Sequence, residues 1–186
     1  MARNRRLVLI LCATATWCTA QFIVLGYVAP ALRHFIGAST PMLAALMALQ
    51  GLCGVAGSVV LARRVGRIGP DRGARASLAL VACGLLAWSA ATLAGLGPWA
   101  MVGVVMLWGL GSFAFVSSQQ ARLATSVPEL ASASIALNSS SLYLGQALGA
   151  AAGGVLVAAF GYAPLGPAAL LTALAALALC VRADRR

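Results

Sequence analysis

The sequence alternates long uncharged stretches with short segments that contain arginine. The uncharged stretches cover residues 7–32, 35–62, 76–121 and 130–181, and they are 26, 28, 46 and 52 residues long. A helix needs about 20 predominantly apolar residues to cross a bilayer. The first two stretches are therefore long enough for one membrane-spanning helix each, and the last two for a pair each.

Glycine and proline divide each of the two longest stretches near its middle. The third stretch contains Gly-Leu-Gly-Pro at residues 95–98, and the fourth contains Phe-Gly-Tyr-Ala-Pro-Leu-Gly-Pro at residues 160–167. Such clusters favour turns, so each long stretch is expected to form a helical hairpin. The sequence thus predicts an all-α membrane protein, a single bundle of six transmembrane helices at residues 7–29, 41–62, 76–95, 99–118, 134–159 and 166–181.

The composition also favours a bilayer over a soluble globule. Hydrophobic residues make up 62% of the chain and charged residues only 9%, whereas soluble domains carry about 25% charged residues. The net charge of +10 raises the possibility of nucleic-acid binding. That function needs basic side chains on one face of a folded domain, but here they occupy short segments between apolar runs. We expect no nucleic-acid partner.

The arginines predict how the chain is oriented in the membrane. The chain has 13 arginines and no lysine, and Arg33 is the only arginine that falls on one of the two sides of the predicted spans. Because arginine accumulates on the cytoplasmic side, both termini are expected in the cytoplasm. The first 20 residues also resemble a secretory signal. The uncharged run continues well beyond Ala20, however, and cleavage there would leave an odd number of helices.

The fifth predicted span is rich in polar and small residues. At 3.6 residues per turn, one face of its helix carries three polar side chains and three glycines, namely Asn138, Ser141, Gly145, Gln146, Gly149 and Gly153. Glycines spaced by four residues let a neighbouring backbone approach closely. We therefore expect Gly145, Gly149 and Gly153 to pack against another helix.

Two further amides occupy comparable positions in other spans. Gln21 shares a helical face with Trp17 in the first span, and Gln50 shares one with Gly54 in the second. An unpartnered amide in hydrocarbon costs free energy, so these groups either bond between helices or line a polar cavity. The candidates for a substrate cavity are Gln21, Gln50, Asn138, Ser141 and Gln146, and purely structural hydrogen bonding is the alternative.

The sequence contains no arrangement typical of an enzyme or a metal site. The single histidine, His34, falls at the predicted membrane edge, and the three acids, Asp71, Glu129 and Asp184, fall outside the predicted spans. The cysteines show no CxxC spacing, and no catalytic motif occurs. We predict no catalytic residue, no metal and no cofactor. Because no charged residue lies inside a predicted span, the chain alone offers no obvious proton relay. Asp71 is predicted to be an exposed ion-pair partner of the arginines in its loop.

One segment resembles a known family. Residues Gln120–Gly161, QARLATSVPELASASIALNSSSLYLGQALGAAAGGVLVAAFG, closely resemble the tenth-to-eleventh helix region of major facilitator superfamily transporters, especially bacterial sugar-efflux and drug:proton antiporter permeases. The shared pattern is Asn-Ser-Ser, then Leu-Gly, then Gly-x-x-x-Gly-Gly and a terminal Phe-Gly. More weakly, Arg64, Gly66 and Arg67 match the family's cytoplasmic-loop signature, Ala-Asp-Arg-x-Gly-Arg, although Arg63 stands where that signature has Asp.

The resemblance implies that the six helices are the C-terminal half of a twelve-helix carrier in the bacterial cytoplasmic (inner) membrane. Carriers of this family hold their substrate near the midplane between two halves that rock to alternate access. The implied function is efflux of small amphipathic or sugar-like molecules with proton exchange, once a second six-helix half or a second copy in a homodimer is present. The alternative is a truncated or structural membrane protein that does not transport.

Overall fold

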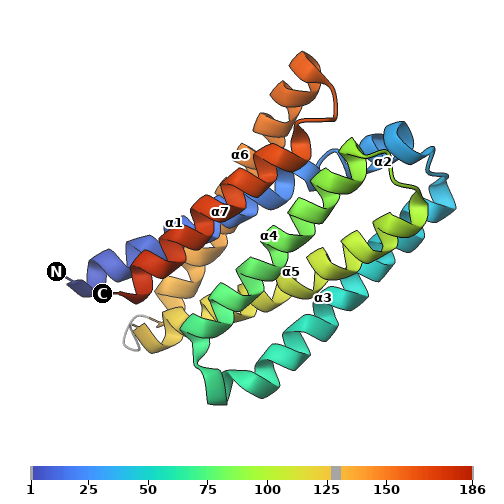
Figure 1. Cartoon of the computed structure of the whole chain (residues 1–186). Helices are drawn as coiled ribbons and strands as arrows, with labels where there is room; N and C mark the ends of the chain where they lie inside the picture. Colours follow the sequence, from blue (N-terminus) through green and yellow to red (C-terminus); the bar gives the residue numbers. More distant parts are fainter. Residues whose placement is uncertain (1, 127–130, 186) are drawn as a thin grey trace.

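The computed structural model describes residues 2–126 and 131–185, so Glu129 and Arg186 lie outside the described residues. Within these ranges the chain forms helices and no strand (Figure 1). The helices are α1 (Ala2–Leu25), α2 (Val28–Ile36), α3 (Thr40–Ile68), α4 (Pro70–Leu93), α5 (Pro98–Ser126), α6 (Ala131–Phe160) and α7 (Leu165–Asp184). All except α2 are long and apolar enough to cross a membrane. The predicted fold class, all-α with six spanning helices, is confirmed.

The six spanning helices form two sets of three, and the first helix of each set packs against the other set. Helix α1 packs mainly against α6 and α7, whereas α5 packs mainly against α3 and α4, and α4 also contacts α7. Figure 1 shows α1, α6 and α7 along one side of the bundle and α3, α4 and α5 along the other. When the spanning helices are divided in chain order into two sets of three, the first helix of each set packs against the second and third of the other set. Both termini lie at the same end of the bundle (Figure 1).

Glycines bring α6 close to α1. A Cβ atom placed on Gly145, Gly149 or Gly153 would come within 2.8 Å of a backbone oxygen of α1. Any larger side chain at these positions would push the two helices apart, because the group it meets is backbone and cannot rotate away. The expected close packing face of the fifth span is therefore directed at α1.

A second close approach joins α3 and α5. A Cβ atom on Gly109 would lie 2.5 Å from the carbonyl oxygen of Gln50, and one on Gly57 would collide with the carbonyl oxygen of Leu110. Small residues at helix contacts are the common packing device inside a membrane, where the hydrophobic effect does not drive helices together. The same device thus holds α1 to α6 and α3 to α5.

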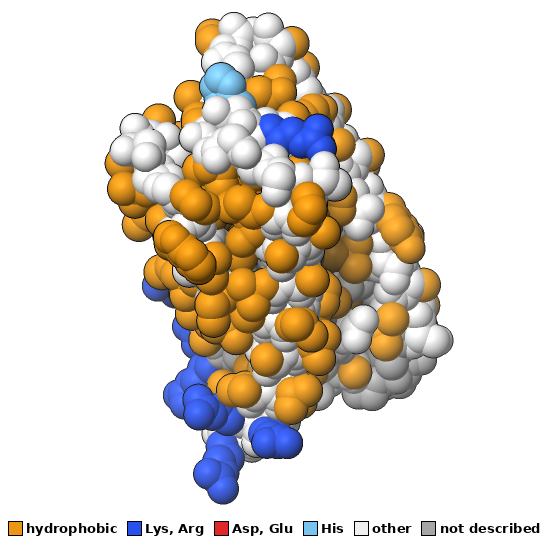
Figure 2. All heavy atoms as spheres, turned by 90° about the vertical axis from the view of Figure 1, so that its right-hand side faces the viewer, with side chains coloured by type: hydrophobic (Ala, Val, Ile, Leu, Met, Phe, Trp, Pro, Cys, Tyr) orange, Lys and Arg blue, Asp and Glu red, His pale blue; other side chains and the backbone are white. Residues whose placement is uncertain are grey.

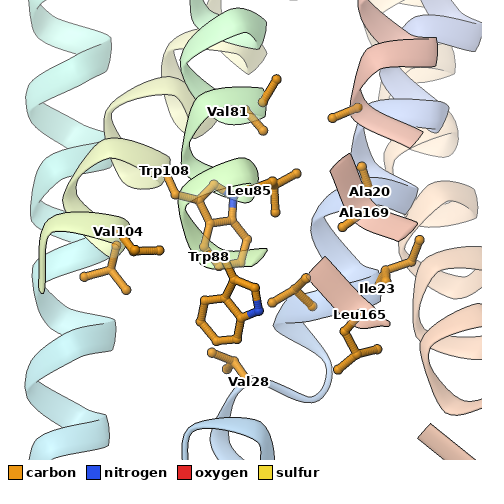
Figure 3. Packing of buried hydrophobic residues seen from close by; sticks show 14 of the residues in the cluster. Ala20, Ile23, Val28, Val81, Leu85, Trp88, Val104, Trp108, Leu165 and Ala169 are labelled. Carbon is orange, nitrogen blue, oxygen red and sulfur yellow. The ribbon is translucent and has the colours of Figure 1, made fainter. Parts of the chain in front are cut away.

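Two tryptophans occupy the apolar centre of the bundle. Trp88 of α4 and Trp108 of α5 are fully buried and meet edge to face, with ring centroids 6.1 Å apart and planes at 68°. Figure 3 shows Leu165 and Ala169 of α7 and Ile23 of α1 on the side of the bundle that faces the Trp88 ring. An edge-to-face pair contributes about 0.5–1.5 kcal/mol beyond its buried area. These contacts fix the position of the Trp108 ring and of its indole nitrogen.

The first span ends earlier than the sequence predicts. Helix α1 stops at Leu25, and α2 resumes at Val28 after a turn at residues 26–27, so the expectation of one helix over residues 7–29 is wrong. Pro30 explains the break, because it has no amide hydrogen to bond to the carbonyl of the residue four positions before it. The Tyr27 hydroxyl then donates to the carbonyl oxygen of Ala150 at 2.9 Å and fastens the turn to α6.

Charged residues do not end the helices where the sequence predicts. Helix α3 continues through its arginines to Ile68, and only Gly69, with φ of 79°, separates it from α4. The expected loop over residues 63–75 is therefore almost entirely helical. Arginine forms helix well, so its charge marks the end of the hydrocarbon but not the end of the helix. Figure 2 shows the same separation on one face, with hydrophobic side chains over the middle, most of the basic surface at the lower end and a smaller basic patch near the upper end.

Candidate functional site

A cavity of about 200 Å³ lies between α1, α3 and α5. Its lining residues are Gln21, Leu25, Met47, Gln50, Gly51, Gly54, Gly109, Ser112 and Phe113. Gly54 lets the Phe113 ring lie against α3, because a Cβ atom there would come 2.8 Å from the ring, whereas a Cβ atom on Gly51 would meet nothing within 4 Å. The cavity therefore combines two amides and a hydroxyl with apolar side chains, and it brings Gln21 and Gln50 together.

Gln21 is buried and has partners at both ends of its amide. Its Nε2 donates to Ser112 Oγ at 2.8 Å, and its Oε1 accepts from Trp108 Nε1. Ser112 in turn donates to the carbonyl oxygen of Trp108 within α5. Gln21 thus ties α1 to α5, and these two bonds use one of its two N–H donors and one of its two acceptor lone pairs.

Gln50 faces the same cavity in a different state. Its side chain is half-buried, and it makes no side-chain hydrogen bond within the part of the chain that the structure describes. An amide carries both donors and acceptors, so Gln50 can bond to a hydroxyl, carbonyl or amine on a ligand. Of the two amides that line the cavity, Gln50 is the one that makes no side-chain hydrogen bond to another described residue, so all of its donors and acceptors remain for a ligand.

The other three candidate residues lie outside this cavity. Asn138 is buried and accepts from Thr14 Oγ1 at 2.9 Å. Ser141 donates to the Leu137 carbonyl oxygen of its own helix at 3.0 Å, and Gln146 is half-buried but does not line the cavity. The reason is that α6 packs chiefly on α1, whereas α3 packs chiefly on α5.

Asn138 begins a chain of buried hydrogen bonds that crosses three helices. Gln119 Nε2 of α5 donates to Thr14 Oγ1 of α1 at 2.9 Å and to the Ile10 carbonyl oxygen at 3.0 Å. Arg122 Nη1 then donates to Gln119 Oε1 at 2.7 Å. Polar groups of α6, α1 and α5 are therefore linked without interruption to a buried guanidinium.

Arg122 is the centre of an ion cluster that the sequence does not predict. Its side chain is 0% exposed, its Nε donates to Asp71 Oδ1 at 2.7 Å, and its Nη2 donates to Asp184 Oδ1 at 2.6 Å. Arg6 pairs with Asp71 at 2.9 Å, and Arg75 lies 3.0 Å from Asp184 Oδ2. The cluster joins α1, α4, α5 and α7 at one end of the bundle.

Two expectations about these charges are therefore wrong. The predicted spans place Arg122 in a loop, but α5 extends to Ser126 and buries it. Asp71 is more than an exposed partner of loop arginines, because it bridges Arg6 and the buried Arg122 with 34% of its side chain exposed. One feature of the sequence could have drawn attention to Arg122, which is the only arginine between the fourth and fifth predicted spans.

The residues of the loop signature lie apart from this cluster. Arg64, Gly66 and Arg67 are exposed on the last turns of α3, inside a helix rather than a loop. Arg64 lines a hollow of about 270 Å³ between α3, α4 and α5. Among the described residues, none of the three contacts an acidic side chain closely enough for an ion pair.

A bundle of six spanning helices, arranged as two sets of three in which the first helix of each set packs on the other set, is the architecture of secondary-transporter repeats. A sequence profile of the Major Facilitator Superfamily matches residues 3–186, and the chain belongs to this family. It is accordingly a multi-pass membrane protein of a family of transporters, not of enzymes, that carry small-molecule substrates. No curated protein matched the sequence.

Proposed function

We propose that this chain is one half of an efflux transporter. It exports small amphipathic or sugar-like molecules by alternating access with proton exchange, and it does so when paired with another six-helix half or with a second copy of itself. In this proposal the chain corresponds to a C-terminal half, resides in a bacterial inner membrane and keeps both termini in the cytoplasm. The arginine distribution and the position of both termini at one end of the bundle support that orientation.

The cavity beside Gln50 is the observation that carries the proposal. Its volume of about 200 Å³ is below the roughly 300–1,000 Å³ of typical ligand pockets. One bundle can therefore enclose only part of a ligand, and a second bundle would supply the remaining wall. The free amide of Gln50 between Met47 and Phe113 suits a molecule that carries both hydroxyl and apolar groups.

The burial of the helices supports a protein partner. Helices α3 and α6 are the least buried of the six spans. The outer surface of α6 includes exposed Ser132 and Ser140, and Tyr143 is 70% exposed. Ser140 donates to the Ala136 carbonyl oxygen of its own helix, but a Tyr143 hydroxyl in contact with acyl chains would lack a hydrogen-bonding partner, so this surface suits another bundle better than lipid alone.

Proton exchange in this proposal depends on the partner half. Asp71 and Asp184 are the carboxylates within the described residues, and both are paired with Arg122 at the end of the bundle. Neither lines the cavity. The proton-carrying groups would therefore belong to the companion bundle.

Transport can be tested in a host that lacks its own efflux systems. The chain is expressed with and without a candidate partner half, and the accumulation of dyes and sugar analogues is measured. Gln50→Leu is expected to abolish a reduction in accumulation that the unmodified pair produces, while Gln120→Leu, which replaces an exposed amide of α5, retains it. Unchanged accumulation in every combination would argue against transport.

A non-transporting structural role is the second candidate, and one observation favours it. The amides of Gln21 and Asn138 are both occupied by bonds between helices. If these bonds only hold the bundle together, Gln21→Leu lowers stability and Gln50→Leu changes neither stability nor ligand accumulation. A ligand-dependent increase in thermal stability that is lost in Gln50→Leu would exclude this role.

A further inference from the structure

A basic hollow lies between the first turns of α1 and the last turns of α7. Its volume is about 600 Å³, and it is lined by Arg5 and Leu9 of α1, by Arg182 of α7 and by Arg185, which caps the C-terminus of α7. Arg5 and Leu9 are one turn apart on the same face of α1. Figure 1 shows the start of α1 and the end of α7 side by side.

The arginines of this hollow differ from the other arginines at the same end of the bundle. Arg6, Arg75 and Arg122 are paired with the carboxylates of Asp71 and Asp184. Within residues 2–126 and 131–185, Arg5, Arg182 and Arg185 have no such partner. Three positive charges therefore converge on one hollow without a carboxylate of the described chain to neutralise them.

The dipole of α7 accounts for only part of this arrangement. A cation near a helix C-terminus is stabilised by about 0.3–1 kcal/mol, which explains why Arg182 and Arg185 occur at that end. It does not explain Arg5, which lies at the N-terminal end of α1, where a positive charge gains nothing from the dipole. The cytoplasmic preference of arginine accounts for its presence at this end of the bundle, and the convergence of Arg5, Arg182 and Arg185 on one hollow suits an anion shared between the two helix ends.

The surroundings of the hollow match those of a lipid headgroup. Arg5 opens the membrane-spanning part of α1, and Arg182 lies near the end of the span of α7, so the hollow is level with the membrane surface. One turn further into the span, Leu9 lines the hollow and the adjacent Val8 is 55% exposed. An acyl chain can lie along these side chains while the phosphate remains among the arginines.

We propose that this hollow binds the headgroup of an anionic phospholipid that carries two phosphates, of the cardiolipin type. Three arginines from two helices match the charge of two phosphates better than that of one, and basic pockets between spanning helices bind such headgroups. The site does not depend on the transport activity proposed above, because it needs only that these helix ends lie at the membrane surface.

The proposal is tested by measuring lipid binding to the purified full chain in detergent micelles with native mass spectrometry. The probes are cardiolipin, phosphatidylglycerol with its single phosphate, and inorganic pyrophosphate. The variant R5Q/R182Q removes one arginine from each helix. The control R63Q/R72Q removes the same charge from two exposed arginines near the junction of α3 and α4.

The unmodified chain is expected to bind cardiolipin more tightly than phosphatidylglycerol. Each arginine near the surface contributes about fivefold in affinity, so R5Q/R182Q is expected to lower cardiolipin affinity about 25-fold while the control retains it. Equal losses in both variants would reduce the effect to diffuse charge attraction and overturn the proposal. Pyrophosphate binding as tightly as cardiolipin would overturn it in favour of a soluble anion.

Discussion

The ion cluster around Arg122 allows a prediction about the order of stability of three variants. In D71N/D184N both carboxylates that contact Arg122 are lost while the guanidinium remains fully buried. Removing the partners of a buried charge typically costs about 3–5 kcal/mol, because the charge is left uncompensated. Neutral acceptors remain for Arg122, namely Gln119 Oε1 at 2.7 Å, Cys180 Sγ at 3.4 Å and the amide oxygens that the two substitutions introduce, but none of them carries a compensating negative charge.

R122M is expected to cost less, although it removes the residue at the centre of the cluster. Asp71 keeps Arg6 at 2.9 Å, and Asp184 keeps Arg75 at 3.0 Å. Both carboxylates also have some access to water, with 34% and 12% of their side chains exposed. The main loss is the donor to Gln119 Oε1, and an unsatisfied buried acceptor costs about 1–3 kcal/mol. The difference between the two variants is therefore about 2 kcal/mol.

The triple variant D71N/D184N/R122M distinguishes charge from shape. It contains no uncompensated buried charge, so it is expected to be more stable than D71N/D184N even though it carries one more substitution. The free energy of unfolding is measured by titration with sodium dodecyl sulfate in mixed micelles, followed by circular dichroism. R72M, which truncates an exposed arginine, is the control and is expected to change the free energy by no more than about 0.5 kcal/mol. The reasoning is refuted if D71N/D184N proves as stable as R122M, or if the triple variant is the least stable of the three.

Two further predictions concern contacts between helices, and the same unfolding titration checks both. Gly57→Ala is expected to lower the free energy of unfolding by about 1–3 kcal/mol, because the added methyl group meets the backbone of α5. The control is Gly51→Ala on the same helix, whose methyl group meets nothing within 4 Å, and it is expected to cost nothing. Equal losses in the two variants would contradict the close contact at Gly57. Asn138→Leu is expected to lower the free energy of unfolding by only about 0.6 kcal/mol, the average for a hydrogen bond between membrane helices, because the Thr14 hydroxyl can still donate to the Ile10 carbonyl oxygen. A loss above about 3 kcal/mol, the upper range for an unsatisfied buried group, would mean that Asn138 has a larger role than this bond.

The number of spanning helices could be predicted from the sequence, and their ends could not. Runs of apolar residues and clusters of glycine and proline report where the chain can cross hydrocarbon and where it must turn, and both signals are local. A helix end depends instead on the residues that leave the hydrocarbon and on whether they can continue the helix. The arginines after Leu61 fit the continuing helix α3, and the turn occurs only at Gly69, where a positive φ is needed.

The ion cluster could not be predicted because its members are distant in sequence. Arg122 meets Asp71 across 51 positions and Asp184 across 62. A lone arginine between two apolar spans is interpreted as a signal of membrane orientation, and that interpretation is usually sufficient to explain its position. Only the packing of α4, α5 and α7 shows that this arginine is enclosed.

The two cavity amides show most clearly what sequence cannot supply. Gln21 and Gln50 have the same chemistry, and helical periodicity predicts a face that contains an amide for each, but the role of an amide depends on whether its hydrogen bonds are already made. Trp108 and Ser112 lie 87 and 91 positions from Gln21 and occupy both ends of its amide. Gln50, opposite in the same cavity, has no such partners among the described residues. It follows that substitution of Gln21 acts first on the packing of α1 against α5, whereas substitution of Gln50 acts first on whatever enters the cavity.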